Sequence, residues 1–253
     1  MNLSMFSLEG KAAIVTGANT GLGQGIAVAL AEAGASLSLV GRSSPDETVE
    51  LVQKAGGKAH VIMADLASLD PVERIVNETK EALGGVDILV NNAGIIKRND
   101  AIDFTVEDWD SVMNVNLRSL FFLSQKAARA MIDAGRGGKI INIASMLSFQ
   151  GGVRVPSYTA SKSGVLGLTR LMANEWAKHG INANAIAPGY FATNNTDALR
   201  ADEKRNTEIL GRIPAGRWGQ PSDLAGAAVF LSSRASDYVH GTVVAVDGGW
   251  LAR

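Results

Sequence analysis

Short apolar runs rich in β-branched residues alternate with helical patterns along the chain, and this alternation restricts the fold more than any other feature. A strand that returns parallel to its predecessor needs a long crossover connection, which is usually a helix. We expect strands at residues 11–16, 36–40, 59–63, 86–90, 139–144, 182–187 and 243–246. We expect helices through Ile26 and Leu30 up to Gly34, and at residues 45–55, 69–83, 105–134, 157–179, 198–210 and 222–232. The sequence therefore predicts an α/β protein with a doubly wound, seven-stranded parallel sheet and helices on both faces.

Composition limits the classes of protein and partner that remain. The 253 residues are 46% apolar and contain no Pro/Ser-rich linker, so we expect one domain over residues 1–253. A net charge of -1 without a long basic run argues against a nucleic-acid partner. The chain has no cysteine and three scattered histidines, so we expect no metal site. It shows neither a signal-type N-terminus nor an apolar run near the roughly 20 residues that span a bilayer, which favours a cytoplasmic protein without a membrane partner.

Tyr158 and Lys162 form the candidate proton-transfer pair. Residues four apart lie on the same face of a helix. A phenol with a pKa of about 10 is a poor base at neutral pH. An ammonium group beside it favours the phenolate, so we expect Lys162 to lower the pKa of Tyr158. Ser145 ends an apolar run upstream, and its hydroxyl is expected to reach the same place. The three residues predict an acid/base site that moves a proton on or off an oxygen.

The turn after the first strand, Gly17 to Gly23, is a candidate dinucleotide site. Its glycines allow the backbone to approach a pyrophosphate, and the following helix offers free N–H groups at its N-terminus. Position 26 is isoleucine, so the G-x-G-x-x-G pattern is absent as a string. The alternative is a turn whose glycines serve only the packing of strand against helix.

The second and third strands end at two further candidate residues. An acid at the tip of the second strand binds the ribose 2′-hydroxyl of NAD, whereas an arginine accommodates the 2′-phosphate of NADP. This strand ends in Gly41-Arg42, which favours NADP unless Arg42 is an ordinary surface arginine. Asp65 follows the third strand and could bind the adenine amino group or cap a local turn.

Two asparagine-containing segments follow. Residues 91–94 (Asn-Asn-Ala-Gly) come after the fourth strand, where small residues would let the chain pass beside a dinucleotide and the amides would fix the loop. The alternative there is an ordinary turn. Asn116 lies inside a helical pattern, and asparagine is a mediocre helix former. Its position indicates a local kink in the helix, a polar network, or no special role.

Taken together and in this order, these motifs resemble the short-chain dehydrogenase/reductase family along nearly the whole chain, and the strings 188–189 (Pro-Gly) and 247–249 (Asp-Gly-Gly) add to the match. The resemblance implies a single-domain Rossmann fold and a catalytic set of Asn116, Ser145, Tyr158 and Lys162. Tyr158 would be the general acid/base, Ser145 would hydrogen-bond the substrate oxygen, and Lys162 would bind the nicotinamide ribose. Asn116 would hold a water that links Lys162 to solvent. The implied contacts of NAD or NADP are Gly17, Asn19, Thr20, Gly21, Leu22, Gly23, Arg42, Asp65, Leu66, Asn92, Ala93, Gly94, Tyr158, Lys162, Pro188, Gly189 and Thr193.

Within the family, longer strings resemble bacterial dehydrogenases of keto-deoxy sugar acids that act in the breakdown of pectin-type uronates and are generally NAD-linked. The substrate carboxylate needs a cation, ideally a bidentate arginine. We expect Ser145, Tyr158, Gln150 and Arg154 to contact the substrate, with Lys97 and Arg98 as the alternative cations and a structural or interface role as the alternative for Arg154. Other reductases of the same family, acting on gluconate, uronate-derived ketoses or 3-oxoacyl groups, remain open, as does a non-catalytic dinucleotide-binding regulator.

Two features concern mobility and assembly. Residues 194–205 are polar and helical by pattern, and we expect a mobile lid over the substrate. The helices expected at 105–134 and 157–179 carry apolar residues on more than one face. This surplus indicates a subunit interface, for which the resemblance implies a homotetramer, or else a deep monomer core. Trp250 and Leu251 are expected to join a second interface.

Overall fold

A computed structural model describes residues 3–253, and at its centre lies a parallel seven-stranded sheet. The strands follow the order β3-β2-β1-β4-β5-β6-β7 across the sheet, and each pairs parallel with its neighbours. In chain order they are β1 (Ala12–Thr16), β2 (Ser36–Gly41), β3 (Ala59–Met63), β4 (Ile88–Asn91), β5 (Gly138–Ile143), β6 (Ile181–Pro188) and β7 (Val243–Val246). The expected doubly wound parallel sheet is confirmed. Residues 1 and 2 of the expected domain lie outside the described range.

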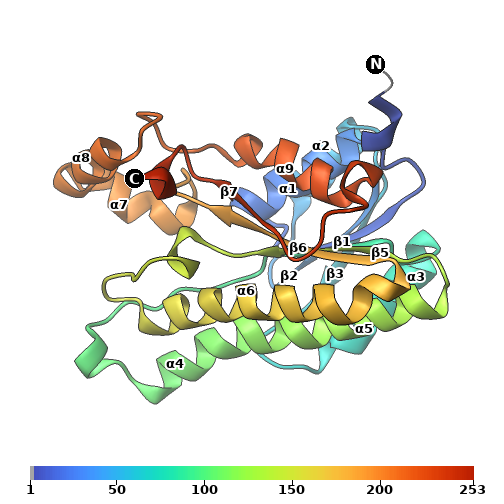
Figure 1. Ribbon diagram of the computed structural model, residues 1–253, viewed down its shortest axis with the longest axis horizontal. Helices are drawn as coiled ribbons and strands as arrows, with labels where there is room; N and C mark the ends of the chain where they lie inside the picture. Colours follow the sequence, from blue (N-terminus) through green and yellow to red (C-terminus); the bar gives the residue numbers. More distant parts are fainter. Residues whose placement is uncertain (1–2) are drawn as a thin grey trace.

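Helices cover both faces of the sheet (Figure 1). They are α1 (Gly21–Glu32), α2 (Asp46–Lys54), α3 (Pro71–Leu83), α4 (Val106–Met113), α5 (Leu120–Asp133), α6 (Pro156–Trp176), α7 (Asp197–Ala201), α8 (Glu203–Arg212) and α9 (Ala225–Ser232). On one face α1 packs with α2 and α9, and on the other α5 and α6 lie under the strands with α3. Helices α7 and α8 lie at one end of the molecule, beside the C-terminus (Figure 1).

The central strands are apolar because both of their faces are covered. Every residue of β1, β4 and β6 is buried. Successive side chains of a strand point to opposite faces. In β1, Ala13 and Val15 accordingly join the core under α1, whereas Ile14 joins the core under α5 and α6. Because β1, β4, β5 and β6 run parallel, their carboxyl ends lie along one edge of the sheet.

Most expected helices differ from the observed ones by a few residues, but two expected helices are interrupted. The helix expected over 105–134 begins where Thr105 accepts a hydrogen bond from the Asp108 N–H, at 3.2 Å, and contains a π-helical stretch, Asn114–Ser119. The helix expected over 198–210 is broken at Asp202. The backbone of Asp202 is extended, and its carboxylate accepts from the Arg205 N–H at 3.1 Å, so Asp202 ends α7 and caps α8.

A third, small hydrophobic cluster attaches α8 to the body of the protein. Met146, Ile209, Ile213 and Trp250 are its buried members, and the C-terminal Arg253 donates to the carbonyl of Gly211 at 2.9 Å. Met146 directly follows Ser145, so the C-terminus, α8 and the end of β5 share one support.

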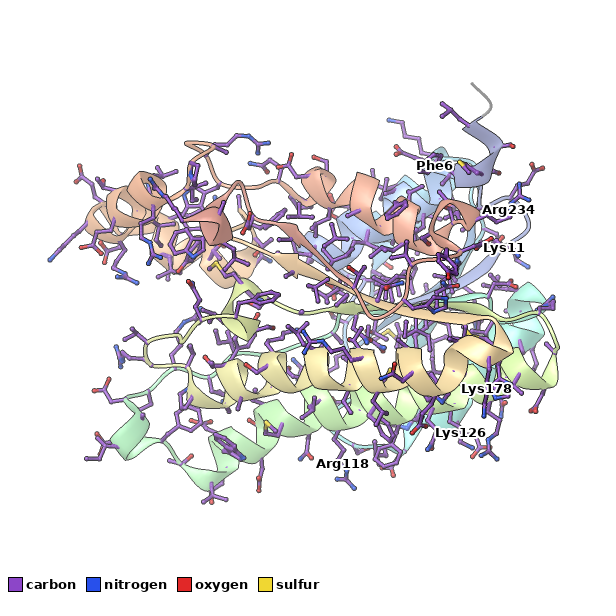
Figure 2. All side chains as sticks on the ribbon, in the orientation of Figure 1. Phe6, Lys11, Arg118, Lys126, Lys178 and Arg234 are labelled. Atoms are coloured by element: carbon purple, nitrogen blue, oxygen red, sulfur yellow. The ribbon has the colours of Figure 1, made fainter. Side chains whose placement is uncertain are left out.

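Basic side chains such as Arg118, Lys126 and Lys178 extend outward from the α5 and α6 layer (Figure 2). Within residues 3–253, none of the helices combines the length and the apolar character needed to cross a membrane.

Candidate active site

A cavity of about 900 Å³ opens at the carboxyl ends of β1, β4, β5 and β6. In an open parallel sheet this is the edge where ligands bind, at the point where the strand order reverses. Here the reversal falls between β1 and β4. A second cavity of about 400 Å³ shares Gly17, Asn19 and residues 93–95 with the first and continues to the end of β2. The two cavities together run from β2 to the α8 segment.

The turn between β1 and α1 can be formed only with glycines at particular positions. Gly17 and Gly21 have φ angles of +63° and +57°, a region that side chains disfavour. A Cβ on Gly23 would lie 2.1 Å from the Gly17 carbonyl oxygen. Thr20 precedes α1 without making a side-chain cap, so the N–H groups at the helix start face the cavity unoccupied by a side chain. This geometry is a cradle for a phosphate group.

Asn92 ties the end of β4 to this turn. Its side-chain amide donates to the carbonyls of Thr16 and Gly17, at 2.9 and 3.1 Å. The Thr16 hydroxyl in turn accepts from the N–H groups of Asn92 and Ala93, both at 3.0 Å. Asn91 points the other way and donates to Ser124 and Asn142 in the core. The amides of this segment fix the loop as expected.

The second cavity collects the residues that follow β2 and β3. Arg42, Asp65 and Leu66 line it together with Asn19, whose amide donates to the Ser43 hydroxyl at 2.9 Å. The Asp65 carboxylate accepts from the Ala67 N–H at 2.9 Å, so it caps its own turn while it faces the cavity. Arg42 is exposed and has no carboxylate within ion-pair distance in the described part of the chain. Its guanidinium is available to a ligand.

Ser145, Tyr158 and Lys162 converge on the first cavity. Tyr158 and Lys162 lie one turn apart on α6, and the Lys162 Nζ is 5.7 Å from the centre of the Tyr158 ring. Ser145 follows β5, caps the short helix Met146–Ser148 and hydrogen-bonds to Tyr158. The Lys162 Nζ donates to the carbonyl of Ile143 at 2.6 Å. The structure therefore brings together the proton-transfer residues expected from the sequence.

The pKa of Tyr158 moves in the opposite direction to the one expected. Burial of the phenol raises its pKa, and this outweighs the opposing effects of the Ser145 hydrogen bond and the Arg98 charge. Burial also lowers the pKa of Lys162 to about 8. The expectation that Lys162 lowers the pKa of Tyr158 considered only the attraction between the two groups. Loss of hydration is the larger effect for both side chains.

Asn116 lies behind the cavity rather than on its wall. It is 1% exposed and sits in the π-helical stretch between α4 and α5. Its carbonyl accepts from the Ile95 N–H at 2.8 Å, and its amide donates to the Ile95 carbonyl and the Ser161 hydroxyl, at 3.0 and 3.2 Å. Asn116 thus joins the loop after β4 to α6, and the polar network that its sequence context indicated is present.

The first cavity is also lined by five residues expected to contact the substrate or the dinucleotide: Gln150, Arg154, Pro188, Gly189 and Thr193. Arg154 has a φ angle of +63°, and its Nε lies 3.0 Å from the Asp100 carboxylate. Its charge is therefore already paired. Of the alternative cations, Lys97 lies 3.2 Å from Asp108 and is not on the cavity wall, whereas Arg98 lines the cavity.

Four further residues lie on this wall: Tyr190, Arg205, Arg212 and Trp250. Arg205 ends the segment expected to be a lid, whereas Tyr190, Arg212 and Trp250 were not expected at the cavity. Trp250 was expected at a subunit interface, but only 4% of its surface is exposed, and it packs against Tyr190 and Met146. Only the tertiary packing of the C-terminus on α8 brings residue 250 beside residue 146, so neither motif nor spacing could have indicated it. No group of three or more acidic or histidine side chains with metal-binding geometry occurs in residues 3–253.

Comparison with known proteins extends these observations. The family described as enoyl-(acyl carrier protein) reductase matches residues 17–251. A 2-dehydro-3-deoxy-D-gluconate 5-dehydrogenase from Escherichia coli (strain K12) is 63% identical over 253 residues, covering 100% of both chains. A solved structure from Agrobacterium tumefaciens, described as a 2-deoxy-D-gluconate 3-dehydrogenase with bound NADP, is 60% identical with a TM-score of 0.93, covering 98% of this chain and 99% of that one. Another from Beutenbergia cavernae, described as an NAD(P)-dependent gluconate 5-dehydrogenase with bound NADP, is 50% identical with a TM-score of 0.94, covering 98% and 100%.

Proposed function

The chain belongs to the short-chain dehydrogenase/reductase family, and on this premise we propose that it interconverts the hydroxyl and keto forms of a keto-deoxy sugar acid. The substrate class follows the Escherichia coli relative, whose name places the oxidation at carbon 5 of 2-dehydro-3-deoxy-D-gluconate. One observation carries the proposal: a single cavity is lined both by the glycine turn after β1 and by Ser145, Tyr158 and Lys162. A phosphate cradle and a proton-transfer group in one cavity suit a dehydrogenase.

The residues around the two cavities fit a nicotinamide dinucleotide. Thr20 leaves the N–H groups at the start of α1 without a side-chain cap, and Arg42 offers a guanidinium with no carboxylate partner in the described chain. When bound, the dinucleotide accepts or supplies the hydride. We propose that residues 17–23 hold its pyrophosphate, and that its other contacts are Arg42, Asp65, Leu66, Asn92, Ala93, Gly94, Tyr158, Lys162, Pro188, Gly189 and Thr193. Arg42 and the NADP bound by two structural relatives favour NADP, with NAD as the alternative.

Tyr158 is proposed to exchange the proton of the substrate oxygen. Because burial raises its pKa, the phenol holds its proton at neutral pH and is suited to protonate a keto oxygen. Oxidation requires the phenolate, and the Lys162 ammonium beside it reduces the cost of that charge. Ser145 is proposed to donate a hydrogen bond to the same substrate oxygen. Asn116 is proposed to hold a water that connects Lys162 with solvent.

Substrate contacts are proposed at Gln150 and Arg154, together with Ser145 and Tyr158. Gln150 and Arg154 come from the loop between Ser145 and α6, which closes the cavity on that side. Arg154 is held to Asp100, so its remaining N–H groups suit neutral hydroxyl oxygens of the sugar chain. Residues 194–205 are proposed to form a mobile lid, because Asn194, Asn195 and Leu199 of this segment line the cavity and Arg98 donates to the Asn195 carbonyl.

The proposal extends to assembly and cellular role. Leu171 on α6 and Trp109 on α4 are 41% and 39% exposed, which supports an interface in a homotetramer. We propose one catalytic domain per chain, working in the cytoplasm in the breakdown of pectin-type uronates. The support for this role is the whole-length similarity to the sugar-acid dehydrogenase from Escherichia coli.

A gluconate 5-dehydrogenase is the second candidate, favoured by the 50% identity with the Beutenbergia cavernae protein. Steady-state kinetics with 2-dehydro-3-deoxy-D-gluconate and with D-gluconate, each with NAD and NADP, separate the two activities. The proposal expects the higher kcat/KM for the keto-deoxy acid. A higher value for gluconate would favour the second candidate, and no turnover of either acid would contradict both.

A further inference from the structure

Three arginine side chains lie around the part of the cavity next to α8. Arg98, Arg205 and Arg212 all line the cavity. Burial raises the pKa of the Tyr190 phenol, and the charges of these three arginines oppose that rise, which places all of them near Tyr190. Such a convergence of positive charge on one cavity wall attracts an anionic group. We call these residues the arginine wall.

The members of the arginine wall differ in what already neutralises them. The Arg205 guanidinium lies 3.1 Å from the Glu208 carboxylate, and Glu208 lines the same cavity. Arg98 donates to the carbonyl of Asn195 at 3.3 Å. Arg212 has no carboxylate within ion-pair distance among residues 3–253. Arg98 likewise has no carboxylate within this distance in the described chain, so Arg98 and Arg212 are the two members whose charge a ligand carboxylate can balance without displacing an acidic side chain.

Arg212 is also held in place before any ligand arrives. Its guanidinium carbon lies 4.1 Å from the centre of the Trp250 ring, and that indole is 4% exposed. A guanidinium that stacks on an aromatic face keeps its N–H edge free for two parallel hydrogen bonds to a carboxylate. The Trp250 indole N–H is buried without an acceptor in the described chain.

The platform under Arg212 is connected to the catalytic hydroxyl. Trp250 belongs to the same hydrophobic cluster as Met146, the residue after Ser145. A shift of the indole therefore disturbs the support of Ser145. The cation and the catalytic hydroxyl thus rest on one cluster, an arrangement that suits recognition of a sugar acid of one length.

We propose that Arg212, stacked on Trp250, binds the carboxylate of the sugar-acid substrate and makes the enzyme selective for acids over neutral sugars. This inference rests on the proposed function and identifies the residue that recognises the acid group. Arg154, whose charge Asp100 already balances, has a different role at the same cavity.

The test compares KM for 2-dehydro-3-deoxy-D-gluconate and for its uncharged methyl ester. In Arg212→Gln we expect KM for the acid to rise about 10- to 100-fold, the effect of losing hydrogen bonds to a charged group, while KM for the ester changes little. Arg154→Gln should change KM for the acid and KM for the ester by the same factor. Arg234→Gln removes an arginine at the opposite end of the molecule from α8, as Figures 1 and 2 show, and should change neither.

Arg212→Lys is a second variant for the case in which Arg212→Gln does not fold. It keeps a positive charge over the indole but cannot form the two parallel hydrogen bonds to a carboxylate. It should lose part of the preference for the acid. An unchanged dinucleotide affinity in each variant establishes that the site is intact. A wild-type ratio of the two KM values in every folded Arg212 variant would overturn the proposal. A wild-type enzyme that turns over no sugar acid would instead overturn the proposed function.

Discussion

Replacing Lys162 with methionine should abolish activity and yet stabilise the fold at neutral pH. Burial lowers the pKa of Lys162 from 10.5 to about 8, which means that the folded protein disfavours the ammonium form. At about 1.4 kcal/mol per pH unit, this difference corresponds to about 3 kcal/mol. Loss of the hydrogen bond to the Ile143 carbonyl costs about 1 kcal/mol in the opposite direction. We expect Lys162→Met to be about 2 kcal/mol more stable than the wild type at pH 7.

The dependence on pH identifies the cause. Between pH 8 and pH 10.5 the lysine is protonated in the unfolded chain and largely neutral in the folded one. The unfolded state therefore binds more protons, and the unfolding free energy of the wild type rises with pH in this window. Below pH 8 the lysine is protonated in both the folded and the unfolded chain. The difference in unfolding free energy between the wild type and Lys162→Met therefore becomes constant.

Urea denaturation of both proteins from pH 6.5 to pH 10.5, at equal protein concentration, measures this difference. All other titratable groups are the same in the two proteins, so their contributions largely cancel in the difference in unfolding free energy. Lys54→Met, at an exposed lysine of α2, is the matched control for the loss of a lysine side chain. A Lys162→Met difference in unfolding free energy that does not change with pH would refute the claim that burial of this ammonium destabilises the fold.

Three further predictions concern the ligand sites. Gly23→Ala places a Cβ 2.1 Å from the Gly17 carbonyl oxygen, so calorimetric titration should show dinucleotide affinity reduced about tenfold or more, whereas Gly226→Ala, with no atom within 4 Å, should retain it. Arg42→Ala should weaken NADP about 10- to 100-fold in a fluorescence titration and leave NAD unchanged; equal losses for both would show that Arg42 does not contact the 2′-phosphate. Ser145→Ala should lower kcat about 100-fold with unchanged dinucleotide affinity, and a wild-type kcat would remove Ser145 from the reaction.

Local sequence patterns predicted the sheet well because the strands read as short apolar runs between helical patterns, and β1, β4 and β6 are buried along their whole length. The expected strands at 59–63 and 243–246 coincide with β3 and β7. The break at Asp202 was not predicted, because the helical pattern continues through it and only the side-chain cap of α8 reveals the interruption.

Properties that depend on tertiary packing were harder to predict from the sequence. The spacing of Tyr158 and Lys162 correctly predicted that the side chains meet, but it did not give the burial that sets both pKa values. Arg154 was the expected cation, but its pairing with Asp100 depends on two loops that are distant in sequence. Arg212 on Trp250 was missed for the same reason.

The most direct test of the central claim follows the reduction of NADP and NAD on addition of 2-dehydro-3-deoxy-D-gluconate, with the wild type and with Tyr158→Phe. The phenylalanine keeps the ring on α6 and removes only the hydroxyl that exchanges the proton. The account predicts turnover by the wild type, and a kcat about 100- to 10,000-fold lower in Tyr158→Phe with unchanged dinucleotide affinity. A Tyr158→Phe enzyme with wild-type kcat, or a wild type inactive on this acid with both dinucleotides, would contradict it.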